Sequence, residues 1–539
     1  MKRIIASILV LLALVFSTNA QITINSQKTI GGSGWDDVGL AGVDSFDNHF
    51  IIGASDSDIS FDKSEDSRGD FDIWVVKTDG NNNILWDKTI GGSNYDSRVH
   101  SIIVNDTVFI ACSSLSDISG EKTMDNFGLG DIWLLALNLN GDILWQESYG
   151  GSENETYPNL VSLPNGNLLL SCNSYSGISG NKDEENIGSS DFWLVELNST
   201  NGSLLQQKTI GSVESESLIE TIISPQQTIT IMGSSVTGIS GDKTDIGYGY
   251  DDIWIVELDM NFNVLKDKCF GGNGEENKIF GAITFDNNSY YIACSSSSNA
   301  SGNKTAPLFS SGSIFVKNDY WLIKTDHDFN IIWDKAYGGF KEDNCTNILL
   351  HDWNKLVLSG ASKSGVSGNK MEASYGGYDG WIVILDKNNG DLIGQKSFGG
   401  IASEGCVVHE SNTNSQGLNL YCGSSSDPSG NKTTPHYGNG DAWILNIDAS
   451  DFLNLETIVD EANVALYPNP FKESFKLTFD ELKEPVTLSI YTSDGRLLSQ
   501  SQLKKGATEF KSKYTGTSNI LFYELKGQTV FSRGKLVKM

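Results

Sequence analysis

The feature that most constrains this chain is a sequence unit of about 60 residues that recurs along most of its length. An aspartate and a tryptophan separated by one residue mark its seven copies, at Asp72/Trp74, Asp131/Trp133, Asp191/Trp193, Asp252/Trp254, Asp319/Trp321, Asp379/Trp381 and Asp441/Trp443. The spacings between successive tryptophans are 59, 60, 61, 67, 60 and 62 residues. A glycine pair, once degraded to Gly-Ser, also occurs seven times, beginning at Gly31, Gly91, Gly150, Gly211, Gly271, Gly338 and Gly399. Two independent markers therefore indicate the same repeat.

Each unit has the pattern of four short β-strands. In the second unit the expected strands are residues 98–104, 108–114, 131–137 and 143–149, which are enriched in β-branched and aromatic residues. Turn-forming Asn, Asp and Gly residues separate the last two strands. Four strands per period without a helical pattern predict the blade of a β-propeller. We therefore expect an all-β fold with a seven-bladed β-propeller over residues 21–448.

The two ends of the repeat array predict how the ring closes. The seventh unit stops after its third strand, at residues 442–448, and lacks the strand that should end in a glycine pair. Residues 22–32 (ITINSQKTIGG) resemble residues 86–92 (WDKTIGG) and have that missing pattern. We expect residues 21–32 to supply the outer strand of the last blade, so that backbone hydrogen bonds join the first and last units.

The C-terminal part of the chain differs in composition from the repeats. Residues 449–463 are irregular and acidic, and we interpret them as a linker. Residues 464–539 contain 12 Lys and Arg against 7 Asp and Glu and several alternating strand patterns. These patterns predict a small Ig-like β-sandwich after the propeller.

The N-terminus and the charge of the chain bound its location and partners. Residues 1–20 combine two basic residues, an apolar run and a small-residue end, the layout of a cleavable signal peptide. No stretch is apolar for the roughly 20 residues of a membrane helix, so we expect no transmembrane segment. The formal charge of the whole chain is −30. Such an acidic surface repels phosphate backbones, so nucleic acid is not an expected partner, and we expect a monomer.

The tail contains three separated motifs: residues 466–471 (LYPNPF), residues 490–496 (IYTSDGR) and residues 534–538 (GKLVK). In this order they resemble the type A C-terminal sorting domain of the type IX secretion system of Bacteroidota. The motif residues are Pro468, Asn469, Pro470, Gly495, Lys535 and Val537. The resemblance implies export across the outer membrane through the secretion translocon, and usually removal of the tail with attachment of the remainder to the cell surface. An ordinary C-terminal sandwich with its own binding role is the alternative.

The repeats are similar to bacterial propeller repeats often found in surface proteins. Each glycine pair is followed by an acidic residue five positions after its first glycine, and then by a strand. This second resemblance implies a fold and no activity, because propellers carry many unrelated functions.

The acidic residues that follow the glycine pairs are the first candidate site: Asp36, Asp96, Glu155, Glu216, Glu276, Asp343 and Glu404. A ring of carboxylates around the axis could hold a hard cation such as calcium through oxygen ligands, although no cofactor is required. A side chain that recurs in every blade is more simply a group that closes a turn by accepting backbone N–H bonds. The recurring lysine of the Ser-Gly-x-Lys loops has a similar simple explanation, as a bond that fixes each loop to its own blade.

Departures from the repeat are more informative than the repeat itself. The fifth unit carries the single long insertion, residues 305–318, with the apolar residues Leu308, Phe309, Ile314 and Phe315, which we expect to be exposed and to form a ligand-contact surface. A disordered insertion is the alternative. The seven cysteines show no CxxC or Cys/His spacing, so the sequence predicts neither a metal site nor a disulfide framework.

Two classes of function remain open. A secreted or surface-displayed propeller could bind an extracellular glycan or protein without catalysis. Alternatively, it could be a polysaccharide hydrolase or lyase, which would need a unique set of acid, base or nucleophilic residues. None of the six histidines belongs to a recognisable motif, so the sequence identifies no catalytic residues.

Overall fold

The computed structural model describes residues 21–236, 238–309, 317–351, 355–410 and 417–453, and in the tail residues 465–467, 471–472, 474–478, 486–492, 497–513, 520–526 and 531–538. The chain divides into two compact units, Met1–Leu453 and Asn454–Met539. The predicted signal peptide lies outside the described residues, as do Ile314, Phe315, Pro468, Asn469, Pro470 and Gly495.

Seven four-stranded antiparallel sheets form the described part of the first unit, six of them from consecutive strands. Sheet 1 contains β2 (Asp36–Val43), β3 (His49–Ser55), β4 (Asp72–Thr78) and β5 (Ile84–Ile90). Sheet 2 contains β6 (Asp96–Val104), β7 (Thr107–Ser114), β8 (Asp131–Leu137) and β9 (Ile143–Tyr149). Sheet 3 contains β10 (Glu155–Ser162), β11 (Leu168–Ser174), β12 (Asp191–Leu197) and β13 (Leu204–Ile210). Sheet 4 contains β14 (Glu216–Ile223), β15 (Ile229–Ser235), β16 (Asp252–Leu258) and β17 (Val264–Phe270).

The remaining sheets continue the same order along the chain. Sheet 5 contains β18 (Glu276–Phe285), β19 (Tyr290–Ser296), β20 (Asp319–Thr325) and β21 (Ile331–Tyr337). Sheet 6 contains β22 (Asp343–His351), β23 (Lys355–Ser362), β24 (Asp379–Asp386) and β25 (Leu392–Phe398). Sheet 7 contains β26 (Glu404–Glu410), β27 (Gly417–Ser424), β28 (Asp441–Asp448) and β1 (Thr23–Ile30). The chain therefore returns to its own beginning in the last sheet.

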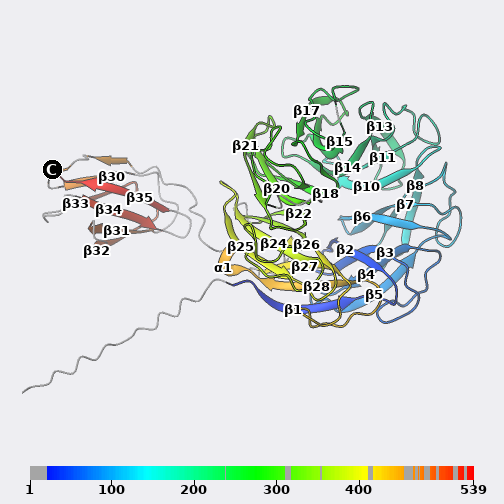
Figure 1. Cartoon of the computed structure of the whole chain (residues 1–539), viewed down its shortest axis with the longest axis horizontal. Helices are drawn as coiled ribbons and strands as arrows, with labels where there is room; N and C mark the ends of the chain where they lie inside the picture. Colours follow the sequence, from blue (N-terminus) through cyan, green and yellow to red (C-terminus); the bar gives the residue numbers. More distant parts are fainter. Residues whose placement is uncertain are drawn as a thin grey trace, which may run out of the picture. The chain divides into compact units, whose positions relative to one another are not determined.

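The first strand of each sheet lies nearest the centre of the ring (Figure 1). Strands β2, β6, β10, β14, β18, β22 and β26 contact one another in succession, except that β2 meets sheet 7 through β27 and β28. Each sheet therefore runs outward from the axis, and its fourth strand forms the rim.

Strand β1 completes sheet 7 at its outer edge. It pairs antiparallel with β28, with Thr29 opposite Trp443 and Ile30 opposite Ala442. The amide of Gln27 adds side-chain bonds: its Oε1 accepts the indole N–H of Trp443 at 3.1 Å, and its Nε2 donates to a loop carbonyl at 2.8 Å. Ile30 is fully buried. The strand thus holds the sheet through backbone, polar and apolar contacts together.

The seven recurring tryptophans are core residues, as the sequence indicates. All are fully buried, on the third strand of each sheet. Each indole N–H donates to an Asp or Gln side chain on the fourth strand of the same sheet: Asp87, Gln146, Gln207, Asp267, Asp334, Gln395 and Gln27. A large apolar ring between sheets with its one donor satisfied is the arrangement that buried tryptophan requires.

The cysteines differ from the expectation in one respect. Cys406 and Cys422 form a disulfide across β26 and β27, where they are directly opposite partners. The expectation of no disulfide is wrong here, because sequence spacing does not reveal strand register. Cys112, Cys172 and Cys294 are free and buried, and they pack as small apolar residues of the core.

The predicted linker begins with ordered structure. The short helix α1 (Ser450–Leu453) follows β28, and Phe452 packs on the core cluster of sheets 6 and 7. This apolar anchor attaches the first residues after β28 to the first unit, so a linker has to start later than residue 449.

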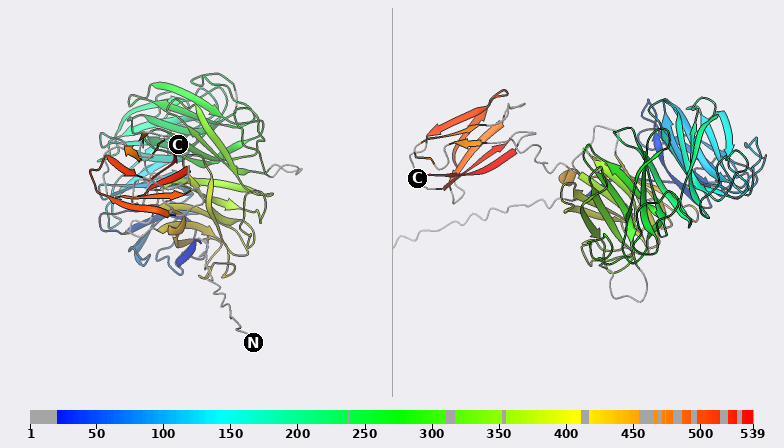
Figure 2. Two further views of the ribbon diagram at one scale, coloured as in Figure 1. Left: turned by 90° about the vertical axis from the view of Figure 1, so that its left-hand side faces the viewer. Right: turned by 90° about the horizontal axis from the view of Figure 1, so that it is seen from above.

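The C-terminal unit contains two antiparallel sheets, whose orange to red strands can be followed in Figure 2. One contains β29 (Ala465–Tyr467), β30 (Ser474–Thr478) and β33 (Glu509–Lys513). The other contains β32 (Leu497–Leu503), β31 (Val486–Thr492), β34 (Ile520–Lys526) and β35 (Phe531–Val537). One apolar cluster, which includes Phe475, Leu488 and Leu536, draws on both sheets. Of the sorting-motif residues, Lys535 and Val537 lie on β35, opposite Phe522 and Ile520.

Candidate functional site

The recurring acidic residues all begin the innermost strands. In every sheet the carboxylate accepts a hydrogen bond from the backbone N–H of the second residue of the preceding glycine motif, as Asp36 does from Gly32 at 2.6 Å and Glu155 from Gly151 at 2.9 Å. The other five acceptors are Asp96, Glu216, Glu276, Asp343 and Glu404. Each side chain also bonds serine hydroxyls at the end of the second strand in its own sheet, as Glu155 does with Ser174. These contacts are those of a turn-closing group.

A second buried carboxylate, the aspartate of the Asp-x-Trp motif in the preceding sheet, lies beside several of these acids. Asp131 of sheet 2 is fully buried and lies within hydrogen-bonding reach of Glu155 of sheet 3. Its Oδ2 accepts the N–H of Phe127 at 2.5 Å, whereas its Oδ1 accepts no hydrogen bond. Asp191 with Glu216, and Asp252 with Glu276, are arranged in the same way. We call these inter-sheet contacts the acid pairs.

A shared proton explains how such pairs are stable. Burial raises the pKa of Asp131, Asp191 and Glu276 to about 7 and that of Asp441 to about 6. One buried lysine accompanies each sheet: Lys63, Lys122, Lys182, Lys243, Lys304, Lys370 and Lys432. In the pairs that contain Asp131, Asp191 and Glu276, a proton on one carboxylate and the nearby lysine ammonium group offset the two negative charges, which is the arrangement that a low-dielectric interior favours.

The lysines fix the long loops to their own sheets, as the sequence analysis interprets them. Lys122 Nζ donates to Ser114 Oγ at 2.8 Å and to the carbonyl of Ser116 at 2.6 Å. Lys304 Nζ donates to the carbonyl of Ala306 at 2.9 Å and lies 5.1 Å from the ring centroid of Trp321. The ammonium groups are therefore occupied inside the fold.

Calcium binding at Asp36 and its six equivalents stays a prediction. Among the residues that the structure describes, no group of three or more His, Cys, Asp and Glu side chains is placed to hold a metal ion. Each acid already accepts bonds from its own turn, and each sheet supplies a lysine near it. A calcium ion would have to compete with these donors.

The acid pairs predict that the protein loses stability as the pH rises from about 5 to about 7. Unfolded aspartate and glutamate titrate near 4, whereas Asp131, Asp191 and Glu276 titrate near 7 in the folded protein. Between these values the folded state binds more protons, so the free energy of unfolding falls with rising pH. His100 and His409, whose pKa burial lowers to about 4, oppose this trend below about pH 6.5 but are outnumbered. Urea titrations should show a fall of at least about 2 kcal/mol.

One variant separates the acid pairs from other titrating groups. Asp131→Asn keeps a side chain that donates to Glu155 but removes one titrating group, so the pH dependence should become shallower. Asp142→Asn, on an exposed hairpin of the same sheet, should leave the dependence unchanged. An unfolding free energy that rises between pH 5 and pH 7 would show that the pairs carry no shared proton.

Of the four apolar residues of the insertion in the fifth unit, the structure describes Leu308 and Phe309, and a ligand-contact role of the insertion stays a prediction. Leu308 and Phe309 are partly buried, and Phe309 packs on the core cluster of sheets 4 and 5. The N–H of Phe309 donates to Asp319 at 2.6 Å, the bond that Phe127 makes to Asp131 in sheet 2. Phe309 is therefore the regular loop residue of its repeat, and the extra length of this unit follows it, outside the described residues.

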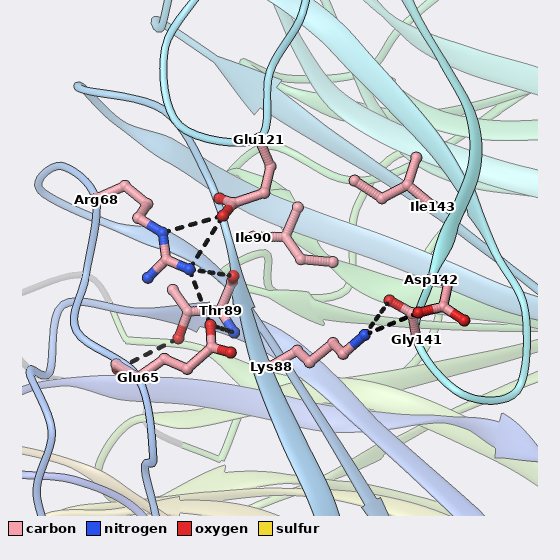
Figure 3. A pocket seen from close by; sticks show the side chains of 9 residues that line it. All are labelled: Glu65, Arg68, Lys88, Thr89, Ile90, Glu121, Gly141, Asp142 and Ile143. Carbon is pink, nitrogen blue, oxygen red and sulfur yellow. Dashed lines mark hydrogen bonds and ion pairs between the residues drawn. The ribbon is translucent and has the colours of Figure 1, made fainter.

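A pocket of about 340 Å³ lies at the rim between sheets 1 and 2, lined by Glu65, Arg68, Lys88, Thr89, Ile90, Glu121, Gly141, Asp142 and Ile143 (Figure 3). The Arg68 guanidinium lies between two carboxylates, 2.9 Å from Glu65 and 3.0 Å from Glu121. It also donates to the carbonyl of Thr89 at 3.3 Å. In sheet 3 the amide of Asn181 makes the equivalent bond to the carbonyl of Ser148. Arg68 and Glu121 thus together take the place of an asparagine of the repeat. Because both carboxylates pair with Arg68, its guanidinium is not available to bind an anion.

Non-repeating polar residues also lie on the innermost strands. His100 Nδ1 accepts the N–H of Leu160 at 3.1 Å, and Glu220 accepts the N–H of Ile283 at 2.6 Å. Both bonds join one innermost strand to the next. Burial lowers the pKa of His100 to about 4 and raises that of Glu220 to about 7, so both side chains are mainly neutral between these values. They serve to hold the sheets together around the axis.

The residues that immediately precede the turn acids lie at the start of the innermost strands. They are on the face that carries the connections from one sheet to the next and the long loops between second and third strands, which we call the loop-bearing face. Across the seven sheets they are Trp35, Tyr95, Asn154, Ser215, Glu275, Glu342 and Ser403. Except at Ser215, the backbone carbonyl of each accepts the N–H of the residue that follows the second strand of its sheet, as Tyr95 does from Leu115 and Asn154 from Tyr175. Four half-exposed side chains gather in sheets 1 to 3: Trp35 (49 % exposed), Tyr95 (41 %), Leu115 (43 %) and Tyr175 (47 %). We call them the crescent. Recurring motifs do not reveal these residues, because they stand at equivalent positions of the repeats where the residue type varies.

The backbone is also unusual beside the crescent. Arg98 and Tyr157 lie on β6 and β10 with φ values of 54° and 55°, in the left-handed region that side chains other than glycine rarely adopt. Both are placed at bulges, and the Arg98 guanidinium stacks 4.0 Å from the ring centroid of Tyr157. Strained backbone of this kind is concentrated at functional sites. Two independent features thus distinguish the same part of the face.

The C-terminal unit determines where the protein acts. Residues 465–519 match the family model described as secretion system C-terminal sorting domain. The chain is exported by the type IX secretion system. Its destination is the cell surface or the extracellular space. A helix with the length and apolar character of a membrane span does not occur among the described residues.

Comparisons with solved structures concern the β-rich fold. The polysaccharide lyase Uly1 is 8 % identical with a TM-score of 0.44, over 78 % of this chain and 90 % of that chain. The WD40 domain of Pan2 from Neurospora crassa is 9 % identical with a TM-score of 0.40, over 79 % and 95 %. A protein of unknown function from Dyadobacter fermentans DSM 18053 is 8 % identical with a TM-score of 0.37, over 66 % and 94 %. No curated protein matches this chain.

Proposed function

We propose that this chain is a secreted or cell-surface binding protein, in which a seven-bladed β-propeller presents a ligand site and an Ig-like β-sandwich directs export. The propeller assignment is supported by the succession of four-stranded sheets and by the pairing of β1 with β28. The sandwich assignment is supported by two antiparallel sheets that share one apolar cluster. In this proposal residues 1–20 are the signal peptide and the exported chain begins near Gln21.

The observation that carries the proposal is the contrast between the polar groups, which are engaged inside the fold, and the half-exposed side chains of the loop-bearing face. The turn acids, the buried lysines and the indole N–H groups are all engaged inside the fold. Arg68, His100 and Glu220 also bond protein groups. The groups that resemble catalytic residues thus serve the structure, whereas half-exposed side chains of differing type remain on the loop-bearing face. Such a face is suited to binding.

The proposal is tested by comparing retention with turnover. The chain from residue 21 to residue 539 is immobilised and exposed to a glycan array and to the extracellular polymers of a producing culture. We expect ligand to be retained without chemical change, as seen by chromatography of the recovered polymer. Complete failure to retain any polymer or protein would contradict a binding function. Appearance of new reducing ends or of unsaturated sugar products would instead establish the alternative, a hydrolase or lyase.

A further inference from the structure

We propose that the crescent is a binding site for the sugar rings of an uncharged polysaccharide. This inference rests on the proposed binding function and names the site and the class of ligand. It requires that the aromatic rings be held rigidly with a face open to solvent, that their place in the ring be distinct, and that the local charge disfavour anionic polymers.

Each aromatic ring of the first two sheets has one supported face. The backbone of Gly440 lies against Trp35, since a Cβ on that glycine would stand 2.5 Å from Cε3 and 2.7 Å from Cζ3 of the indole. The backbone N–H of Trp35 donates to Asp56 Oδ1 at 2.5 Å, which holds the main chain at this position. Tyr95 stacks on Phe71 with ring centroids 5.4 Å apart and planes at 26°. Rigid rings supported on one side offer the flat apolar surface against which the C–H face of a sugar packs.

The crescent continues into sheet 3 through local contacts. A Cβ on Gly130 would stand 2.5 Å from Leu115 Cδ2, so this side chain rests on the backbone as Trp35 does. Tyr175 is tied by its N–H to the carbonyl of Asn154 at 3.0 Å. Arg98 and Asn154 lie at the same end of the innermost strands and supply donors for hydroxyl groups. A series of apolar platforms with a few polar groups is the usual composition of a site for neutral ligands.

The opposite side of the face has different chemistry. In sheets 5 and 6 the corresponding positions hold Glu275, Glu342 and Lys363, and the last two form an ion pair at 3.5 Å. Residues 21–463 contain 24 Lys and Arg against 61 Asp and Glu, a net charge of −37. This field repels polyanions, so an uncharged polymer is the ligand that both the rings and the charge accommodate.

The test removes two platforms at once. Laminarin and dextran serve as uncharged probes, and polygalacturonate and alginate as anionic probes, in affinity electrophoresis with the chain from residue 21 to residue 539. We expect the wild type to bind an uncharged probe and Trp35→Ala/Tyr95→Ala to bind it at least about tenfold more weakly. Trp35 is the tryptophan of the crescent, so any quenching of tryptophan emission by the bound probe should be lost in Trp35→Ala/Tyr95→Ala.

A matched control removes two other exposed aromatic residues of the same face. Tyr250 and Phe340 are 67 % and 65 % exposed and lie in the loops before β16 and after β21, and Tyr250→Ala/Phe340→Ala should bind as the wild type does. Urea unfolding of both double variants establishes that each remains folded. Equal binding by the crescent variant and the wild type would overturn the site while the binding function stands. Binding restricted to anionic probes or to proteins would overturn the ligand class.

Discussion

Removal of residues 21–30 should lower the free energy of unfolding by at least about 5 kcal/mol, because β1 fills the outer position of sheet 7. The deletion removes Ile22 and Ile30, which are buried, and each such loss costs roughly 2 to 5 kcal/mol. It also exposes the edge of β28 and takes the acceptor from the Trp443 indole. Urea unfolding followed by tryptophan emission measures the effect.

A relocated strand provides the control for this deletion. A variant chain carries residues 21–32 after Asp448, joined through a copy of the turn at residues 138–142 that links β8 to β9. Sheet 7 then forms from consecutive strands, as the other sheets do, and most of the lost stability should return. Deletion without loss of stability, or relocation without recovery, would contradict the pairing of β1 with β28.

Gly150→Ala should destabilise the protein by about 2 to 4 kcal/mol, since it forces a methyl group into an acid pair. The added Cβ would stand 2.6 Å from Glu155 Oε2 and 2.5 Å from the carboxylate carbon of Asp131. The carboxylates of Asp131 and Glu155 both approach this glycine, and both are fully buried, so the added methyl group meets them in a closely packed site. The midpoint of urea unfolding should fall with an unchanged slope.

A glycine without neighbours gives the matched comparison. A Cβ on Gly423, in β27, would meet nothing within 4 Å. Gly423→Ala should therefore change the free energy of unfolding by no more than about 0.5 kcal/mol. Equal effects of the two substitutions would show that the carboxylates over Gly150 impose no steric demand.

The class of the fold can be predicted from the sequence because the same pattern of four strands recurs in successive repeat units. In the second unit, expected strands 131–137 and 143–149 coincide with β8 and β9. The innermost strand begins two residues earlier than expected, at Asp96. Its carboxylate closes the turn through Gly92 while its backbone already pairs with Ser114. A polar residue at such a boundary both closes the turn and pairs in the strand, whereas its residue type alone predicts only the turn.

The remaining features depend on spatial neighbours that a single sequence does not contain. Cys406 and Cys422 become partners through the register of β26 and β27. Phe309 belongs to the insertion by numbering but to the regular loop by its bond to Asp319. Nothing in the sequence distinguishes Trp35 and Tyr95 from other aromatic residues. They become neighbouring positions only because β2 and β6, which they precede, belong to adjacent sheets. Alignment of equivalent positions between repeats is the signal that would have identified them.

Sheet 7 combines the first strand of the chain with three strands from the end of the repeats, and this affects the order in which the fold can be completed. Gln27 and Trp443, which bond each other, are separated by 416 residues. During synthesis β1 has no pairing partner until β28, the last strand of the ring in chain order, has been made. The sorting domain follows β28 in the chain. A molecule that carries this export signal therefore already contains both β1 and β28. A product that ends before β28 lacks both the pairing partner of β1 and the sorting domain, so it carries no signal for export.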